Sequence, residues 1–250
     1  WRRQHDRDPL VSDLKPILAN NLVGVDINQD AVRVACFSLY LAMADAIDPR
    51  HYVTREKVFP PLRDTRLLRA DFFDEALEGI RTDEDAQTFD LVIGNAPWGD
   101  KSVKNTSELV EVSTQKTSST KKKKGPPTKA QAWAKGRWPV ANNDIGPLFV
   151  AKALELVNAT GRVAMVQPAP PWLYQRAQPA LDLRKQFFTG YSVDEITNLS
   201  AVRRELFNDV IGPACVIVAG TEKPDPNSEL YYFAPKPIRI SPEATELRIE

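Results

Sequence analysis

A short apolar run that stops abruptly constrains this chain more than any other feature of its sequence. Leu91 to Ile93 have the length and composition of a buried β-strand. The run ends at Gly94-Asn95-Ala96-Pro97, a cluster of turn-forming residues, and Trp98 follows at once. Open α/β sheets build their ligand sites where strands end. The sequence therefore predicts an α/β fold with a ligand site at the carboxyl end of this strand.

The residues of this turn can hold and activate an amine. The side-chain oxygen of Asn95 and the backbone carbonyl of Ala96 can each accept a hydrogen bond from an NH2 group. Two such bonds draw the nitrogen lone pair out of conjugation with an aromatic ring, which makes the nitrogen a better nucleophile. Trp98 offers a flat face on which a base can stack. Taken alone, the tetrapeptide is better explained as an ordinary turn after a strand.

Two further predicted strands end in an acidic residue. The run from Leu22 to Asn28 is apolar up to Asp26, and the run from Arg66 to Phe73 closes on Asp71. An acid at the end of the second strand of a nucleotide-binding sheet characteristically binds ribose hydroxyls. The alternative for each aspartate is a helix N-cap, for Asp71 before a short helix at 74–80. For Asp26 we favour the cofactor role.

The turn after Ile93 resembles a known motif. Asn95-Ala96-Pro97-Trp98 is similar to the Asn-Pro-Pro-(Tyr/Phe/Trp) motif of amino-methyltransferases, above all the DNA adenine-N6 methyltransferases. Ala96 stands where the first Pro is usual, but in the family that residue contributes its carbonyl, which Ala also carries. The resemblance implies that Asn95, Ala96, Pro97 and Trp98 form the catalytic turn.

The same resemblance implies a cofactor, a fold and a second set of site residues. Asp26 with Ile27, and Asp71 with Phe72, lie where the family binds S-adenosylmethionine, while Phe73 is expected in the core. The implied fold is a Rossmann-like α/β sheet, mostly parallel, whose last strand is antiparallel. The resemblance also places Phe207 near the target base, and a place in the core is at least as good an alternative for this residue.

One element of the family is missing from this sequence. The resemblance covers roughly residues 20 to 220, but the Gly-rich turn that should precede Asn21 does not occur in residues 1 to 20. We therefore expect the central first strand to be absent between the strands at Val23 and Leu91. The chain, which opens on Trp1, is expected to be a piece of a longer protein that binds cofactor poorly or not at all by itself.

Apolar periodicity predicts the remaining elements of the sheet and its helices. We expect a strand at 193–199 to lie at an edge and a strand at 214–220 to be buried. The other expected elements are helices at 31–46, 148–157 and 178–189, a strand at 162–168 and a possible strand at 230–233.

Composition suggests a partial catalytic domain with a basic insertion. Residues 1–220 are predicted to form a partial methyltransferase domain, 101–139 a basic flexible insertion within it, and 221–250 a linker or the start of a following domain. Lysines 121–124, with Trp133 and Trp138 downstream, suit a phosphate backbone. A solvated lysine run is the simpler alternative for any single lysine.

Charge and cysteine content exclude several other classes of function. Lys+Arg and Asp+Glu both number 33, so the surface as a whole has no excess of positive charge to attract nucleic acid. Cys36 and Cys215 lie far apart in apolar runs, which predicts buried thiols in a reducing, cytoplasmic compartment. No apolar run reaches the length of a membrane span. With only His5 and His51, a metal centre or a hydrolytic triad is not expected.

The sequence thus predicts an S-adenosylmethionine-dependent DNA methyltransferase, specific for the N6 amine of a flipped adenine. Its expected partners are double-stranded DNA and further domains of a bacterial restriction-modification or phage-defence enzyme, for target recognition and, as in some of these enzymes, for cleavage. Methylation of a protein glutamine or an RNA adenine is one alternative, against which the basic insertion argues mildly. A non-catalytic DNA-binding scaffold is another, favoured by Ala96 and the missing Gly-rich turn.

Overall fold

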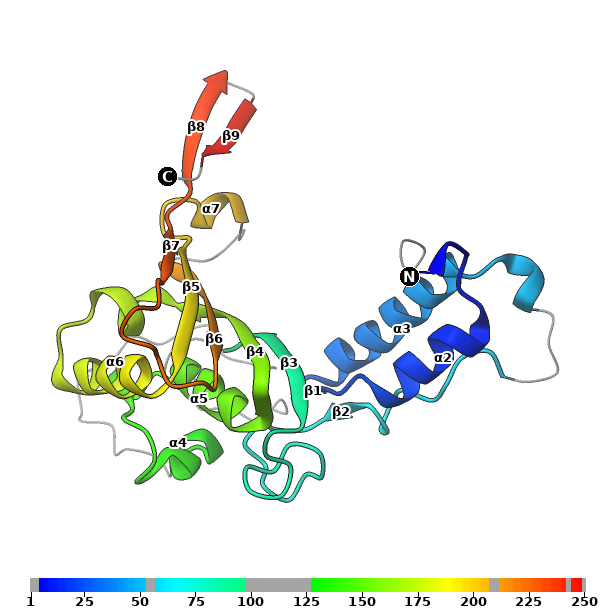
Figure 1. Ribbon diagram of the computed structural model, residues 1–250, viewed down its shortest axis with the longest axis horizontal. Coiled ribbons are helices and arrows are strands. Elements are labelled where there is room, and N and C mark those ends of the chain that lie inside the picture. Colours follow the sequence, from blue (N-terminus) through cyan, green and yellow to red (C-terminus); the bar gives the residue numbers. More distant parts are fainter. Residues whose placement is uncertain (1–4, 53–56, 98–126, 207–211, 242–243, 249–250) are drawn as a thin grey trace, which may run out of the picture. The chain divides into compact units, whose positions relative to one another are not determined.

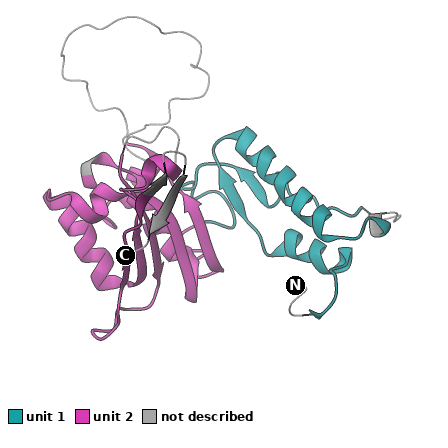
Figure 2. Ribbon diagram, turned by 90° about the horizontal axis from the view of Figure 1, so that it is seen from above, with its two compact units in different colours: residues 1–80 teal, residues 81–250 magenta. Residues whose placement is uncertain are grey.

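The protein forms two compact units. The computed structural model describes residues 5–52, 57–97, 127–206, 212–241 and 244–248. Its contacts divide the chain into unit 1, residues 1–80, and unit 2, residues 81–250 (Figure 2). The predicted boundary at residue 220 concerns the domains of the whole protein and stays a prediction.

Unit 1 is a two-stranded parallel sheet packed against helices. β1 pairs with β2 in parallel, and α3 contacts both strands. The elements of this unit are α2 (Val11–Asn20), β1 (Gly24–Asp26), α3 (Gln29–Ala46), η1 (Pro49–Tyr52) and β2 (Leu67–Arg69) (Figure 1). Its core is made of the buried side chains Leu18, Val32, Cys36, Met43, Ile47, Leu62 and Leu67. The short helix expected at 74–80 is wrong, because residues 71–80 form turns.

Unit 2 is built on a five-stranded sheet of order β3-β4-β6-β5-β7. The elements around this sheet are β3 (Phe89–Asn95), α4 (Lys129–Ala134), η2 (Ala141–Asn143), α5 (Gly146–Leu156), β4 (Val157–Pro168), η3 (Pro170–Tyr174), α6 (Gln178–Gly190), β5 (Ser192–Asn198), α7 (Arg203–Leu206), β6 (Ala214–Gly220) and β7 (Tyr231–Phe233). A separate hairpin follows, formed by β8 (Lys236–Ser241) and β9 (Ala244–Arg248).

Strand directions confirm the mostly parallel sheet with an antiparallel last strand. β3 and β4 are parallel, and β6 runs antiparallel to both of its neighbours, β4 and β5. β5 and β7 are parallel. β3, β4, β5 and β7 therefore all end on the same side of the sheet, which we call the carboxyl rim. The expectation that β5 is an edge strand is wrong, because β7 pairs with its outer side.

One face of the unit 2 sheet is well covered and the other is open. Met165, Ile217 and Ile196 pair across neighbouring strands, so they share one face of the sheet, and all three are buried. α5 packs against β4. On the opposite face of β3, Leu91 and Ile93 are 57% and 71% exposed. Parallel strands are normally covered on both faces. This half of the sheet therefore exposes apolar surface that a soluble protein would normally cover.

The two sheets are not joined by any described strand of this chain. Among the described residues β1 pairs with β2 alone, and β3 pairs with β4 alone. The expectation that the central first strand is missing between the strands at Val23 and Leu91 stays a prediction. A parallel pair such as β1 and β2 has too few strands for much independent stability.

The aromatic residues of the predicted basic insertion belong to the core, which corrects the sequence interpretation. Trp133 is 8% exposed and its Nε1 donates to Thr82 Oγ1 at 2.8 Å. Trp138 is 7% exposed and stacks on Tyr191, with ring centroids 5.8 Å apart. Thr128 caps helix α4. The end of the 101–139 segment is therefore ordered, its tryptophans are not available to bases, and lysines 121–124 lie outside the described residues.

Gly161 is required where β4 approaches the backbone of β3. A Cβ atom added at Gly161 would lie 2.6 Å from Asp90 O and 2.5 Å from Val157 Cγ1. Gly161→Ala is expected to lower the free energy of unfolding by about 1–3 kcal/mol, because a backbone atom cannot move aside. Urea unfolding measures the change. Gly190→Ala is the matched control, since nothing lies within 4 Å of its added Cβ. Equal unfolding midpoints for the two variants would contradict the close approach.

Burial keeps the Cys215 thiol protonated. Desolvation raises its pKa to about 12, and Cys36 is also buried with a raised pKa. In the native protein Cys215 is expected to resist iodoacetamide at pH 9, the ordinary pKa of a thiol. Because the folded-state pKa of Cys215 is raised, the stability that its buried, protonated thiol contributes is fully present below pH 9. This stability declines as the pH rises towards 12. Mass spectrometry after alkylation tests the expectation, and rapid labelling without unfolding would refute it.

Candidate functional site

The predicted catalytic turn leaves the carboxyl rim at the end of β3. Asn95 is the last residue of β3 and pairs with Val166 of β4. Asn95 and Pro97 are exposed, whereas Ala96 is 7% exposed. The Asn95 amide is thus accessible on a strand that the sheet holds in place. Trp98 lies outside the described residues, so its stacking role stays a prediction.

The two predicted acidic cofactor residues lie beside each other in unit 1. β1 and β2 are parallel with Asp26 opposite Arg69, and Ala70 N donates to Asp26 O at 3.1 Å. Asp71 follows directly, so both carboxylates stand where two adjacent parallel strands end. Neighbouring strands are about 4.8 Å apart, which is close enough for both acids to contact one nucleoside.

Local hydrogen bonds show what each carboxylate does in the fold. Asn28 caps α3, because its Oδ1 accepts from Asp30 N at 2.8 Å. Asp26 Oδ1 accepts from Asn28 N at 2.7 Å, so the N-cap alternative for Asp26 is wrong. Asp71 Oδ1 accepts from Phe73 N at 2.9 Å and closes a turn that no helix follows. In both carboxylates Oδ2 makes no hydrogen bond or ion pair with a described residue and can accept hydrogen bonds from a ligand.

Apolar side chains flank the two acids. Ile27 is 48% exposed directly after Asp26. Phe72 is half-buried and meets Phe73 edge to face, with ring centroids 5.6 Å apart. Phe73 is 4% exposed, which confirms its expected place in the core. Ile27 and Phe72 thus leave apolar surface beside the carboxylates, the combination that an adenosine group requires.

The predicted site residues therefore form two groups. Asp26, Ile27, Asp71 and Phe72 come together in unit 1, and Asn95 to Pro97 belong to unit 2. Phe207 lies outside the described residues, so its place near the base stays a prediction. The described residues contain no group of three His, Cys, Asp or Glu side chains arranged to hold a metal ion. In the same part of the chain, no helix is both long and apolar enough to cross a membrane.

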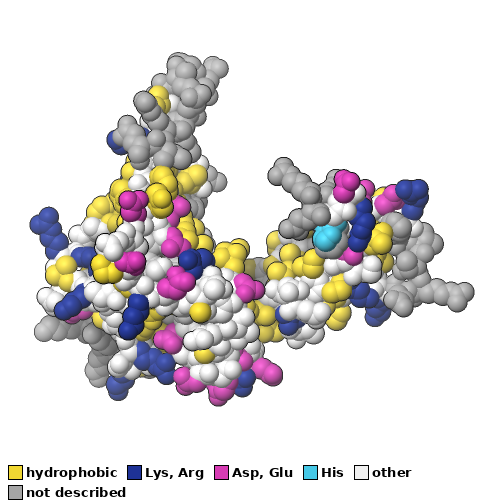
Figure 3. Space-filling model, in the orientation of Figure 1, with side chains coloured by type: hydrophobic (Ala, Val, Ile, Leu, Met, Phe, Trp, Pro, Cys, Tyr) yellow, Lys and Arg dark blue, Asp and Glu magenta, His cyan; other side chains and the backbone are white. Residues whose placement is uncertain are grey.

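A polar cluster at the carboxyl rim was not predicted from the sequence. Asn198, the last residue of β5, bonds the hydroxyls of Tyr174 and Tyr232, and Ser200 bonds Asn198 in turn. We call these four residues the rim cluster. Tyr174 and Tyr232 are each 49% exposed. Figure 3 shows side chains of the hydrophobic class, which includes tyrosine, at the surface of this region around β7 and α7. The members come from three separate segments, so no local sequence pattern could have indicated them.

Known structures share this fold. The chain aligns with the type I restriction enzyme EcoKI M protein at a TM-score of 0.53 and 12% identity, covering 93% of this chain and 39% of that one. The nuclease-deletion mutant of the type ISP restriction-modification enzyme LlaGI, solved with a DNA substrate mimic, aligns at 0.55 and 14% identity, covering 93% and 22%. LlaBIII, an ATP-dependent type ISP enzyme bound to DNA, aligns at 0.56 and 12%, covering 93% and 16%. The chain thus spans well under half the length of these proteins.

Family membership rests on a second comparison. No curated protein matches the chain. The family model of the Eco57I restriction-modification methylase matches residues 20–204, which include both groups of site residues. The acid at the end of β1, the acid after β2 and the turn after β3 all fall within this match. The chain belongs to the Eco57I restriction-modification methylase family.

Proposed function

We propose that this chain carries the catalytic turn and part of the cofactor site of an S-adenosylmethionine-dependent DNA methyltransferase that acts on the N6 amine of adenine. The observation that carries the proposal is the exposed Asn95 at the end of β3, followed by the Ala96 carbonyl and Pro97, in a chain of the restriction-modification methylase family. A parent enzyme of restriction-modification type follows from the same family.

Asn95 and Ala96 activate the amine in this proposal. Asn95 Oδ1 and the Ala96 carbonyl each accept one N–H of the adenine amine. These bonds hold the nitrogen lone pair out of the ring and aimed at the methyl donor. The proton leaves to solvent after the nitrogen becomes cationic, so no general base with a shifted pKa is required. Pro97 fixes the backbone of the turn, and Trp98 stacks on the flipped base.

The residues after β1 and β2 fit the adenosine part of the cofactor. Asp26 Oδ2 accepts from the ribose hydroxyls and Asp71 Oδ2 from the adenine amine, since neither oxygen makes a hydrogen bond or ion pair with a described residue. Ile27 and Phe72 pack on the adenine ring. When bound, S-adenosylmethionine supplies an electrophilic methyl group on a sulfonium.

Double-stranded DNA is the proposed substrate, and further domains of the parent protein are the proposed partners. LlaGI and LlaBIII, which share this fold, were solved with a DNA substrate mimic and with DNA. The chain covers 39% or less of each compared structure, which leaves room for a target-recognition domain and a nuclease. The protein is proposed to act in the cytoplasm, where DNA and cofactor meet.

A substrate panel tests the class of acceptor. The full-length protein that contains this chain is incubated with tritiated methyl donor and, separately, duplex DNA, RNA of the same sequence and a glutamine-bearing protein. Label is expected in DNA alone. Label in RNA or protein would replace the proposal by the corresponding methyltransferase, and label in none, with DNA still bound, would favour a non-catalytic scaffold. Heat-denatured enzyme is the control for non-enzymatic transfer.

A further inference from the structure

We propose that the rim cluster, together with Arg203, binds the phosphate backbone of duplex DNA about four nucleotides from the one that the Asn95 turn receives. The inference rests on the proposed function and adds to it a second surface for the same DNA. Hydroxyl and arginine side chains are typical phosphate ligands that fix the register of a protein on a duplex without reading its sequence.

Asn198 fixes the direction of every hydrogen bond in the rim cluster. Its Nδ2 donates to Tyr174 Oη at 2.8 Å and to Tyr232 Oη at 2.7 Å. Its Oδ1 accepts from Ser200 N at 3.1 Å and from Ser200 Oγ at 2.6 Å. The Ser200 proton is thus used, so in the 3.1 Å contact between Tyr174 Oη and Ser200 Oγ the tyrosine must donate.

This accounting leaves one hydroxyl proton for a ligand. The Tyr174 proton goes to Ser200, and the Ser200 proton goes to Asn198. Tyr232 accepts from Asn198, but its own proton meets no acceptor among the described residues, and its side chain is 49% exposed. The Tyr232 hydroxyl, which the Asn198 side-chain amide holds in place, can therefore donate its proton to a ligand. Its complement is an acceptor without a proton of its own, such as a phosphate oxygen.

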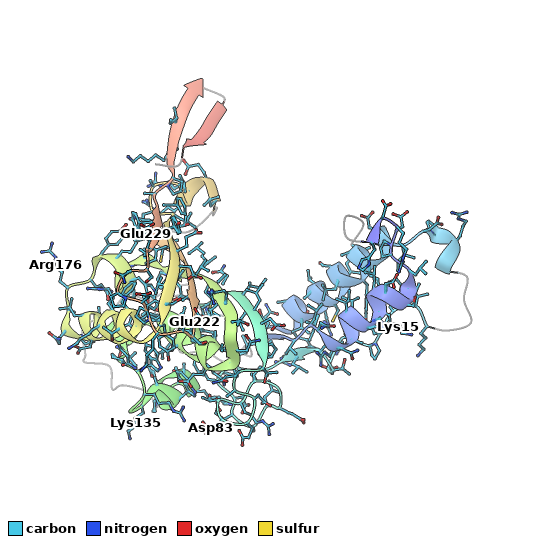
Figure 4. All side chains as sticks on the ribbon, in the orientation of Figure 1. Lys15, Asp83, Lys135, Arg176, Glu222 and Glu229 are labelled. Carbon is cyan, nitrogen blue, oxygen red and sulfur yellow. The ribbon has the colours of Figure 1, made fainter. Side chains whose placement is uncertain are left out.

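Arg203 brings positive charge to the rim cluster. Its Nη1 donates to Ser200 O at 2.6 Å, while its buried Nε makes no hydrogen bond within the described part of the chain. α7 carries Arg203 and Arg204 against one acid, Glu205. The nearest acid on β5, Glu195, lies on the opposite face of the strand from Asn198 and accepts a hydrogen bond from Thr197. Arg176, in contrast, points away from the body of unit 2 (Figure 4) and is not part of this surface.

The sheet register places this surface level with the catalytic turn. Asn95 pairs with Val166, Val166 with Val216, and Val216 with Thr197, the residue before Asn198. β5 is the third strand from β3, so the separation is about 14 Å at about 4.8 Å per strand. One DNA strand advances about 3.4 Å per nucleotide. The rim cluster thus lies about four nucleotides from a base held by Asn95.

Two tyrosine variants distinguish a role of the rim cluster in DNA binding from a purely structural role. Tyr174→Phe and Tyr232→Phe each remove one acceptor of Asn198, but only Tyr232→Phe removes the outward proton. Using the full-length protein and a fluorescein-labelled mixed-sequence DNA duplex, we expect Tyr232→Phe to bind about tenfold more weakly and Tyr174→Phe to bind like the wild type. Both variants are expected to be folded at the assay temperature, which their melting curves check. Tyr232→Phe should retain kcat for methyl transfer at saturating DNA. Its KM for DNA should rise.

The salt dependence of binding tests Arg203 independently. Arg203→Gln can still donate to the Ser200 carbonyl but carries no charge, and we expect it to reduce the slope of log Kd against log salt by about 0.9, the value for one phosphate contact. Lys223→Gln is the matched control, because Lys223 is exposed beyond the end of β6, on the side where β5 begins. It should leave the slope unchanged.

The outcomes distinguish this surface from the proposed function. Wild-type affinity in both Tyr232→Phe and Arg203→Gln would refute the surface, even if methyl transfer to DNA proceeds. Equal weakening by Tyr174→Phe and Tyr232→Phe would assign the cluster a purely structural role. Absence of DNA binding by the wild type would overturn both this surface and the proposed substrate.

Discussion

Asn95→Ala is expected to lower kcat for methyl transfer to DNA at least about a hundredfold, the loss typical of removing one preorganised polar group from a transition state. The amide oxygen is needed when the amine becomes a nucleophile, so KM for DNA should change little. Asn95 is exposed at the end of a paired strand, and its truncation removes no packing. The measurement is steady-state transfer of a tritiated methyl group by the full-length protein.

Asn227→Ala is the matched control for this variant, because Asn227 is an exposed amide in the same unit, distant in sequence from the turn. It should retain full kcat. If Asn95→Ala raised KM and left kcat unchanged, the side chain would serve in binding alone, and the proposed activation of the amine would be wrong.

Asp26→Ala is expected to weaken S-adenosylmethionine binding by about 10- to 150-fold, since hydrogen bonds to a charged group contribute about 1.5–3 kcal/mol. Calorimetry should be run on a longer form that extends the chain at its amino end, and on the chain by itself. The longer form is expected to bind. The chain alone is expected to bind poorly or not at all, because β1 and β3 lie in separate sheets.

Asp45→Ala, an exposed acid on α3 of the same unit, is the control and should leave the affinity unchanged. Loss of Asp26 Oδ1 also frees Asn28 N, so the helical content of the variant is compared by circular dichroism. Tight binding by the chain alone would show that the predicted missing strand is not needed. Undiminished binding by Asp26→Ala would remove Asp26 from the cofactor site.

The sheet was predictable because its strands are continuous apolar runs. Runs such as Leu91 to Ile93 and 214–220 have the length and composition of strands, and they appear as β3 and β6. The acids at the ends of β1 and β2 followed from the rule that parallel strands end at ligand sites. Family resemblance added the antiparallel direction of β6, which apolar periodicity alone does not specify.

Contacts between residues far apart in the chain determined the features that the sequence did not predict. Trp133 and Trp138 sit in a basic, polar stretch whose composition predicts mobility, but contacts with Thr82 and Tyr191 bury them. β5 became an inner strand because Tyr231 to Phe233 returned to pair with it. The rim cluster depends on segments far apart in the chain, so only the fold brings its four side chains together.

The most direct test of the central claim is the identity of the methylated nucleoside. DNA treated with the full-length protein and S-adenosylmethionine is digested to nucleosides and analysed by mass spectrometry, with the Asn95→Ala protein as the blank. We predict N6-methyladenine, present with the wild type and absent with the variant. A methylated cytosine in its place, or N6-methyladenine formed equally by Asn95→Ala, would contradict the assignment of this turn to adenine.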